Sequence, residues 1–291
     1  MHSNNHNHSP FWLCPSCHNP LLLQDKVWRC DKQHSFDCAK EGYVNLLLAQ
    51  QKSSKDPGDN KEMVAARRAF LAQDHYLPLA SKIAELLFVA LKSDKTAAEK
   101  QAVYSIYDAG CGEGYYLATI RSMLAEKGFT LNASGSDISK SAIQKAAKKY
   151  KDIQYAVASS FNLPLTDDSQ DALIQVFAPS DSSQVSRVLK SGGLWLKVTP
   201  ASQHLFELKQ YVYEHAVSHD VDTSIPAHFN LVSQHRLAFT LRLDSDSERE
   251  SLLMMTPFYW TISADKKREL LQDLKTVSAD FDITLMINNK D

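Results

Sequence analysis

The sequence predicts an α/β protein with a mostly parallel, seven-stranded sheet, preceded by a small metal-binding unit. Segments with strand and helix character alternate from residue 102 onward, a pattern typical of parallel sheets. A glycine-rich turn at 108–116 joins the first strand to the first helix. Four of the five cysteines lie within residues 14–38, and this clustering favours a bound metal over a disulfide framework.

Size and composition are ordinary for a globular protein. The 291 residues suffice for an α/β domain and a smaller unit. No apolar run approaches the roughly 20 residues that span a bilayer, and the polar, histidine-rich residues 1–9 lack the apolar core of a signal peptide. We therefore expect a cytoplasmic protein without a membrane partner, and a solvated N-terminal tail. The net charge of −2 means that nucleic-acid binding would need a local basic face.

The metal-binding unit has the pattern C-x2-C-x12-C-x3-H, formed by Cys14, Cys17, Cys30 and His34. A C-x-x-C knuckle presents two thiolates on one side of a metal, and a hairpin over 21–29 would bring the second pair across. Three thiolates and one imidazole complete a tetrahedral Zn²⁺ shell, which indicates a structural zinc. The alternative is a reduced cysteine pair with a chance histidine. His18 and Cys38 are substitutes, and we expect Cys38 to be a small buried residue.

Aromatic and cationic side chains share this unit, and two interpretations of them stay open. They can stack on bases and meet phosphates, or they can form the small core and solvated rim of a zinc ribbon. They are Trp12, Trp28, Arg29, Lys32, Phe36, Lys40 and Tyr43.

Residues 46–60 are polar and contain the turn signal Asp56-Pro-Gly-Asp59. They form a plain linker or an ordered loop in which Lys52 and Lys55 meet phosphate. Two helices are predicted next, over 62–71 and about 76–91, and residues 93–101 form a polar connection.

The glycine turn has the form Asp108-Ala-Gly110-Cys-Gly112-Glu113-Gly114. Glycines here let the chain turn sharply and let a ligand approach the backbone. The spacing G-x-G-x-G differs from the dinucleotide fingerprint G-x-G-x-x-G, although a turn in another nucleotide-binding sheet is the alternative.

The second strand, 130–137, ends at Asp137, whose carboxylate can accept hydrogen bonds from both ribose hydroxyls of a nucleoside. The alternative is that Asp137 caps the next helix, over 138–150, a task that Ser139 can perform instead. The lysines of that helix indicate a solvated face.

Further strands are predicted over 153–158, 171–177 and 194–199, with a helix over 185–189 and a turn over 190–193. Asp181 follows the strand that ends at 177, where an open α/β sheet presents its active site. We do not assign it as a general base.

The order of these motifs resembles that of class I S-adenosylmethionine (AdoMet) methyltransferases. The resemblance rests on the Asp-x-Gly-x-Gly-x-Gly turn, on Asp137, on the loop Ser159–Leu165 and on Leu189-Lys-Ser-Gly-Gly193 before an apolar strand. It implies a Rossmann-like methyltransferase sheet. It also implies that the loop from Ser159 holds the adenine and that the helices before the first strand cover the cofactor.

The C-terminal third is less regular. A helix is predicted over 204–215, a strand over 231–243 and a final strand over 281–287, with the last two closing the sheet as an antiparallel hairpin. The segment Met255-Thr-Pro-Phe258 either lines the mouth of a substrate site or packs between helices.

Several motifs together resemble a narrower family, the bacterial 23S rRNA (guanine-N1)-methyltransferases known as RlmA or RrmA. The chain shares with it the cysteine–histidine unit, Ala39-Lys-Glu-Gly-Tyr-Val-Asn-Leu-Leu47, Asp56-Pro-Gly-Asp59 with Arg67-Arg-Ala-Phe-Leu71, Asp108–Tyr116, Leu163-Pro, His204-Leu and Met255-Thr-Pro-Phe258. The histidine-rich N-terminus and the longer connection at 93–101 are departures that touch no motif. Of its two subgroups, which modify neighbouring guanines, the chain looks closer to the Gram-negative type.

This resemblance implies AdoMet-dependent methylation of guanine N1 in a domain II hairpin of 23S rRNA, by a homodimer whose zinc unit helps to recognise the RNA. It implies cofactor contacts from Tyr76, His204 and the loop with Gly112, Glu113, Gly114, Tyr115 and Tyr116. The expected domains are residues 1–45 for RNA recognition, 46–101 as linker and helical cover, and 102–291 for methyl transfer. A methyltransferase for small molecules or another RNA, and a non-enzymatic zinc RNA-binding protein, are the alternatives.

Overall fold

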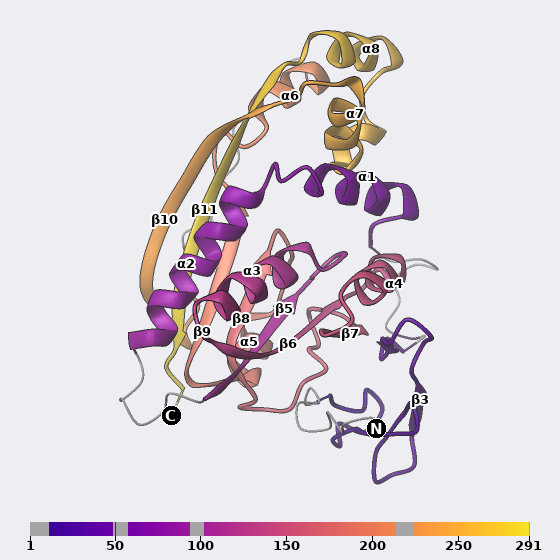
Figure 1. Ribbon diagram of the computed structural model, residues 1–291, viewed down its shortest axis with the longest axis vertical. Coiled ribbons are helices and arrows are strands. Elements are labelled where there is room, and N and C mark those ends of the chain that lie inside the picture. Colours follow the sequence, from indigo (N-terminus) through magenta and orange to yellow (C-terminus); the bar gives the residue numbers. More distant parts are fainter. Residues whose placement is uncertain (1–11, 49, 51–57, 94–101, 214–223, 291) are drawn as a thin grey trace.

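A computed structural model describes residues 12–48, 50, 58–93, 102–213 and 224–290. Its centre is a twisted sheet with helices on both faces and the cysteine-rich unit at one edge (Figure 1). Asp56 and Pro57 of the predicted turn, Lys52 and Lys55 before it and the connection at 94–101 fall outside the described residues.

The central sheet has the order β10-β11-β9-β8-β5-β6-β7-β4. The strands from β9 to β4 run parallel, whereas β11 pairs antiparallel with both β9 and β10. The predicted antiparallel closing hairpin is therefore confirmed. The bounds are β4 Val44–Asn45, β5 Val103–Ala109, β6 Thr130–Asp137, β7 Gln154–Val157, β8 Gln170–Val176, β9 Leu189–Pro200, β10 Phe229–Arg242 and β11 Thr276–Asn288.

The helices follow the hydrophobic pattern of the sequence. In α4, for example, Ala142, Ile143, Ala146 and Ala147 are buried and the lysines face outward. In Figure 1, α2, α3 and α4 lie on one face of the sheet and α5 on the other. The helices are α1 Lys61–Leu71, α2 Leu77–Ser93, α3 Tyr115–Glu126, α4 Lys140–Lys149, α5 Ser182–Val188, α6 Phe206–Val212, α7 Asp246–Met254, α8 Ala264–Asp273 and the 3₁₀ turn η3 Pro257–Trp260.

One predicted turn is absorbed into a strand. Residues 190–193 were expected to be a turn before a strand at 194, but β9 begins at Leu189, which pairs with Gln170. Leu194 then pairs with Ala172, so that four residues of β9 oppose Asp171 alone. The Lys190-Ser-Gly-Gly193 segment is thus an irregularity inside the sheet, and such bulges re-aim a strand without ending it.

The cysteine-rich unit contains a three-stranded antiparallel sheet of β1 Leu22–Gln24, β2 Val27–Arg29 and β3 Ser35–Asp37. This confirms the predicted hairpin over 21–29. The unit is joined to the main body, because Leu13 donates a backbone hydrogen bond to Pro164 (2.9 Å) and β4 pairs with β7 as an eighth strand.

Three aromatic residues of this unit belong to its core, whereas Arg29, Lys32 and Lys40 are exposed and their contact with phosphate stays a prediction. Trp12, Trp28 and Tyr43 are 0 %, 2 % and 5 % exposed, so they are core residues and not stacking platforms for bases. Trp12 packs edge-on against Tyr107 of β5, with ring centroids 6.3 Å apart. The small core of the unit therefore continues into the core beneath the main sheet.

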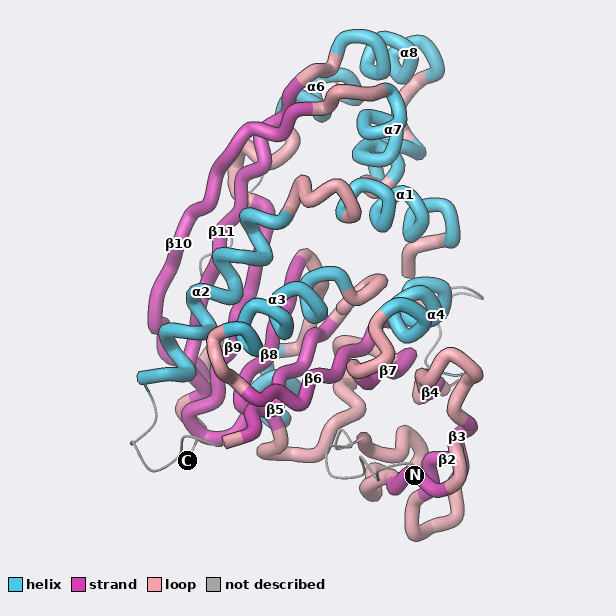
Figure 2. The backbone as a smooth tube through the Cα atoms, in the orientation of Figure 1, coloured by secondary structure: helices cyan, strands magenta, loops and turns pink. Residues whose placement is uncertain are grey.

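A helical cap lies beyond the carboxyl ends of the parallel strands. Figure 2 shows β10 and β11 as a long curved pair that reaches toward α6, α7 and α8. Helix α7 packs on α1, where His75 Nε2 lies 3.3 Å from the Glu248 carboxylate. Among the described helices, none is both long enough and apolar enough to cross a membrane.

Candidate functional site

The predicted metal ligands come together. The ligand atoms of Cys14, Cys17, Cys30 and His34 all lie within 4.8 Å of one another. The Cys17 and Cys30 sulfurs are 3.7 Å apart, and His34 Nδ1 is 3.5 Å from the sulfurs of Cys14 and Cys30. A tetrahedral zinc shell has S···S edges of about 3.8 Å and S···N edges of about 3.6 Å, given its usual bond lengths. The donor set therefore fits Zn²⁺, with four protein ligands and no open position.

The two predicted substitutes stand outside this cluster. Neither His18 nor Cys38 belongs to the group of four ligands. Cys38 is half-buried beside Trp28, and burial raises the pKa of its thiol. It is accordingly a packing residue, as expected.

The glycine turn connects β5 to α3 and is tied to the end of β6. Gly110 N and Cys111 N donate to Ser136 O at 2.8 and 2.9 Å. Gly110 has a φ of +81°, and a Cβ built on it would lie 2.3 Å from Ala178 Cβ. Only glycine fits there, because the turn must pack directly against the segment that follows β8.

Asp137 serves the turn in this structure. Its carboxylate accepts from Gly112 N at 3.0 Å and from Ser139 N at 2.7 Å. Ser139 stands at the N-cap position of α4, although its side chain makes no capping hydrogen bond. Asp137 thus links the glycine loop to the start of α4. This resembles the alternative role, in which Asp137 caps that helix. Asp137 also lines the cavity, and its contact with a ribose stays a prediction.

A cavity of about 260 Å³ opens above the glycine turn. Six of the predicted cofactor residues line it: Gly110, Gly112, Glu113, Tyr115, Tyr116 and Asp137. Asp108 is 1 % exposed at the end of β5, and Gly114 begins α3. Ser159 is not among the lining residues, so its contact with adenine stays a prediction.

A second cavity, of about 300 Å³, adjoins the first and is mostly apolar. It contains Tyr76 and His204, the other two predicted cofactor residues. Met255, Pro257 and Phe258 also line it, which supports the interpretation of that segment as a substrate mouth. The two cavities share Arg67, Leu71, Tyr116 and Phe177.

The first cavity is acidic and poor in hydrogen-bond partners. Burial, with the neighbouring charges of Asp137 and Glu113, raises the pKa of Asp108 to about 8. Burial also raises the pKa of Glu113 and of Asp137. Within the described residues, Glu113 Oε1 and the hydroxyls of Tyr115 and Tyr116, which line this cavity, have no hydrogen-bond partner. The same holds for Asp108 Oδ1 at the end of β5 and for the hydroxyl of Tyr76 in the second cavity. Buried polar atoms are normally paired, so this arrangement fits a polar ligand that carries positive charge.

Sequence reasoning missed several lining residues. Gly58 and Asp59 line the first cavity, and Asp59 O accepts from Ser139 Oγ at 2.9 Å. Arg67 forms an ion pair with Asp59. The only available signal was the Asp-Pro-Gly-Asp turn shortly before the Arg-Arg pair, because the approach of this segment to β6 depends on tertiary packing.

Asp181 has a structural task. It is exposed and caps α5 by accepting from Ser183 N at 2.8 Å. Asp181 lines neither of the two cavities at the glycine turn.

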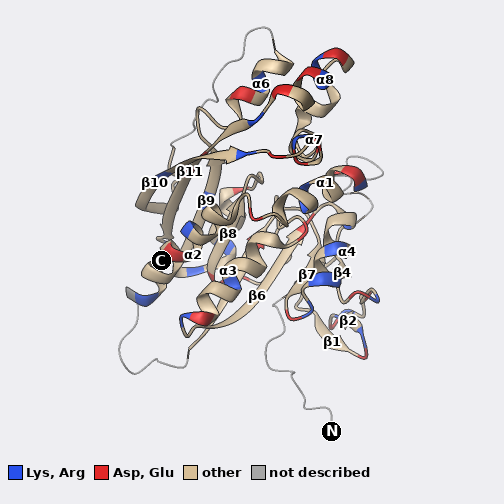
Figure 3. Cartoon of the chain, turned by 45° about the horizontal axis from the view of Figure 1, so that its top comes forward, with Lys and Arg blue, Asp and Glu red and all other residues tan. Residues whose placement is uncertain are grey.

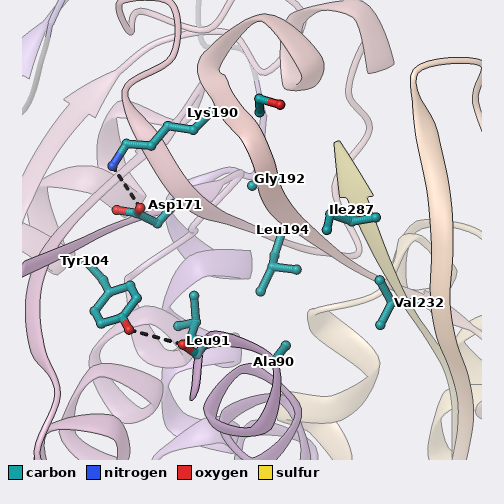
Figure 4. Close-up of a pocket in the computed structure, with 11 residues that line it drawn as sticks. Ala90, Leu91, Tyr104, Asp171, Lys190, Gly192, Leu194, Val232 and Ile287 are labelled. Atoms are coloured by element: carbon teal, nitrogen blue, oxygen red, sulfur yellow. Dashed lines mark hydrogen bonds and ion pairs between the residues drawn. The ribbon is translucent and has the colours of Figure 1, made fainter. Parts of the chain in front are cut away.

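A further cavity, of about 360 Å³, lies at the opposite end of the parallel strands (Figure 4). Its charged groups satisfy each other, since Lys190 Nζ lies 2.8 Å from Asp171, whose other oxygen accepts from Ser105 N at 2.8 Å. Ligands of open α/β sheets bind at the carboxyl ends of the strands, so the glycine-turn cavities are the candidate site.

Comparisons with known proteins agree with this geometry. Residues 12–55 match the model of the N-terminal zinc ribbon of RlmA, and residues 106–193 match a methyltransferase domain model. The chain is 34% identical over 281 residues to the 23S rRNA (guanine(748)-N(1))-methyltransferase of Streptomyces fradiae, covering 94% of this chain and 93% of that protein. It is 30% identical to YxjB of Bacillus subtilis strain 168, covering 95% and 96%. YxjB carries a provisional name as a 23S rRNA (guanine-N(1)-)-methyltransferase.

Among solved structures, geranyl diphosphate C-methyltransferase from Streptomyces coelicolor A3(2) matches with a TM-score of 0.39 at 15% sequence identity, covering 72% of this chain and 76% of the other. A likeness at this level carries no argument about the site.

Proposed function

Because the chain belongs to the 23S rRNA (guanine-N1)-methyltransferase family, we propose that it methylates N1 of a guanine in a domain II hairpin of 23S rRNA. It is an AdoMet-dependent methyltransferase with a zinc ribbon. The observation that carries the proposal is the pair of adjoining cavities at the carboxyl end of the sheet, one acidic and one apolar.

The acidic cavity suits the cofactor. When bound, AdoMet supplies a methyl group on a positively charged sulfonium. Asp137 keeps the Gly112 amide in place. Burial raises the pKa of Asp108 and of Glu113, and a bound sulfonium would favour their negatively charged forms. We propose that Gly110, Gly112, Glu113, Gly114, Tyr115 and Tyr116 surround the cofactor, that Asp137 binds its ribose, that Ser159 lies beside its adenine, and that Tyr76 and His204 contact its end nearest the apolar cavity.

The apolar cavity suits a nucleobase. A base inside a helix must be unstacked before an enzyme can reach it, so the target is expected in a loop or as an extruded nucleotide. Much of the catalysis would be the positioning of guanine N1 against the methyl group. We assign no general base for the N1 proton.

The same proposal assigns a role to each of three parts of the chain. Residues 1–45 would recognise RNA, 46–101 would connect and cover the cofactor, and 102–291 would transfer the methyl group. We further propose that the protein acts in the cytoplasm as a homodimer, which sedimentation at several protein concentrations would test.

The function is tested by primer extension on 23S rRNA from a strain that lacks the gene. We expect one N1-methylguanine stop to disappear and to return when the gene is restored, which identifies substrate and position together. An unchanged stop pattern contradicts the rRNA proposal. Transfer of labelled methyl from AdoMet to small metabolites, but not to rRNA, would favour the small-molecule alternative.

AdoMet affinity should rise between pH 6 and pH 8. The raised pKa of Asp108, about 8, leaves this group largely protonated at the lower pH. A cationic ligand favours the carboxylate, so binding releases protons, and one such group changes the affinity by at most about tenfold per pH unit. Calorimetry in buffers of different ionisation enthalpy measures the release. Asp108→Asn should flatten the profile, and an equally steep profile in that variant would assign the proton elsewhere.

The lysines of α4 offer a local basic face beside the zinc unit. Figure 3 shows lysines of α4 in blue close to β4. Gln144 Nε2 donates to a Glu41 carboxylate oxygen at 3.0 Å, and Lys151 Nζ donates to Glu41 O at 3.2 Å. Lys148 and Lys149 are exposed. Such residues can meet phosphates although the whole chain has a net charge of −2.

The double variant Lys148→Glu/Lys149→Glu should therefore bind the rRNA hairpin more weakly. The slope of log affinity against log salt should fall by about one per lost phosphate contact, with AdoMet binding unchanged. Lys266→Glu/Lys275→Glu on and beside α8 makes the same charge change at two exposed positions far along the chain. Equal weakening in both double variants would show only a general effect of net charge.

A further inference from the structure

Phe177, the first residue after β8, has an unusual backbone. Its φ is +56°, in the left-handed region that bulky residues rarely adopt. Eight non-glycine residues of the described chain have positive φ, and Phe177 and Leu205 are the two apolar ones. Both line the apolar cavity. Strain of this kind persists only where the surrounding structure imposes it, and it gathers at functional sites.

The surrounding structure does impose it. Phe177 N donates to Val198 O at 3.1 Å, which continues the β8–β9 ladder past the end of β8. Gln175, which is 3 % exposed, donates to Ala178 O through its amide nitrogen. Its amide oxygen accepts from Ser180 Oγ at 2.7 Å and from Trp195 Nε1 at 3.1 Å. A buried side chain thus fixes the turn immediately after Phe177.

The turn is also fixed from the side of the glycine loop. Ala178 Cβ fills the space where Gly110 would otherwise carry a Cβ. The segment that bears Phe177 is therefore in direct contact with the loop that lines the acidic cavity. A shift of either one would displace the other.

The ring of Phe177 is held at the junction of the two cavities. It lines both of them and is 40 % exposed, although the neighbouring rings of His204 and Phe281 are buried. It stacks near His204, with ring centroids 5.8 Å apart and an interplanar angle of 28°, and lies 5.6 Å from Phe281. These contacts fix the plane of the ring and leave part of it open to the cavity.

We propose that Phe177 is the stacking platform for the guanine that receives the methyl group, presented at the boundary of the two cavities by its strained turn. The proposal rests on the proposed function. Aromatic side chains stack on unpaired bases, and this one is rigid, accessible and adjacent to the acidic cavity. Gln175 acts through the turn and is a positioning residue.

The test compares Phe177→Leu with Phe177→Tyr. Both variants keep a Cβ and so keep the backbone strain, but only tyrosine keeps a flat ring. We expect Phe177→Leu to lower kcat/KM for a domain II hairpin by about tenfold to 100-fold, the range for loss of one base–aromatic contact. Phe177→Tyr should restore most of the activity. AdoMet affinity, measured by calorimetry, should be the same in all three proteins.

A second readout reports stacking itself. A hairpin with 2-aminopurine at the target position should show a change in fluorescence with wild-type protein and with Phe177→Tyr, and a smaller change with Phe177→Leu. The control is Phe129→Leu, which alters an aromatic packed on Tyr104 (centroids 5.1 Å apart) outside both cavities.

Three results would overturn the stacking role. They are unchanged kinetics in Phe177→Leu, equal losses in Phe177→Leu and Phe129→Leu, and a loss of AdoMet affinity as large as the loss in kcat/KM. The last would mean that Phe177 packs on the cofactor. Absence of methyl transfer by the wild-type protein would instead overturn the proposed function. This outcome is distinct, because it is measured on the wild-type protein alone.

Discussion

Gly110→Ala should abolish AdoMet binding and destabilise the protein. At a φ of +81° an alanine costs about 1–2 kcal/mol relative to glycine, and its Cβ would stand 2.3 Å from Ala178 Cβ. The glycine loop or the segment after β8 must then move, and the Gly112–Asp137 hydrogen bond lies in the same loop. We expect AdoMet affinity to fall by more than about 100-fold, an amount equal to some 2.7 kcal/mol, as measured by calorimetry.

Gly128→Ala is the matched control. Gly128 has a φ of +88°, but no atom of the described chain lies within 4 Å of the Cβ that it would carry. This variant therefore measures the backbone penalty without the steric clash. It should lower the melting temperature slightly and leave AdoMet affinity unchanged. Equal losses of stability in the two variants would show that the close approach of Ala178 to Gly110 is unimportant.

Cys17→Ser should remove the zinc and, with it, methylation of the rRNA. Structural zinc contributes about 10–16 kcal/mol of binding free energy to small domains, and three ligands hold the ion far less tightly than four. Methylation of the hairpin should fall by more than about 100-fold, because the zinc unit would no longer be ordered. Metal content by plasma mass spectrometry should fall well below one zinc per chain.

Cys38→Ser distinguishes the ligand from a neighbouring cysteine. Cys38 lies in the same unit but outside the four-ligand cluster, so this variant should keep its zinc and most of its activity. AdoMet binding should survive in both serine variants, since the cofactor cavity has no lining residue from the zinc unit. Full zinc content in Cys17→Ser, or zinc loss in Cys38→Ser, would mean that the ligand set is wrong.

Local patterns predicted most of this site, and long-range packing supplied the rest. The spacing of the four metal ligands and of the glycines is short-range information, so Cys14 and Gly110 were identified without a structure. The burial of Trp12 was undecidable from sequence, because its partner Tyr107 lies on β5, almost 100 residues later. Asp59 lines the acidic cavity, where its carbonyl oxygen accepts a hydrogen bond from Ser139 Oγ, a residue 80 positions later in the chain. The turn expected at 190–193 lies inside β9, because Leu189 before it and Leu194 after it both pair with β8.

The short strand β4 has a consequence for anyone who wishes to study the catalytic part alone. Its two residues, Val44 and Asn45, cover the outer side of β7. A fragment that started after residue 45 would leave β7 with unpaired backbone groups, and such an uncovered edge recruits other chains and promotes aggregation. It would also expose the apolar surface beneath Trp12 and Leu165. A fragment for the study of methyl transfer should therefore begin at residue 12, so that the zinc ribbon and β4 stay attached and cover the edge of β7.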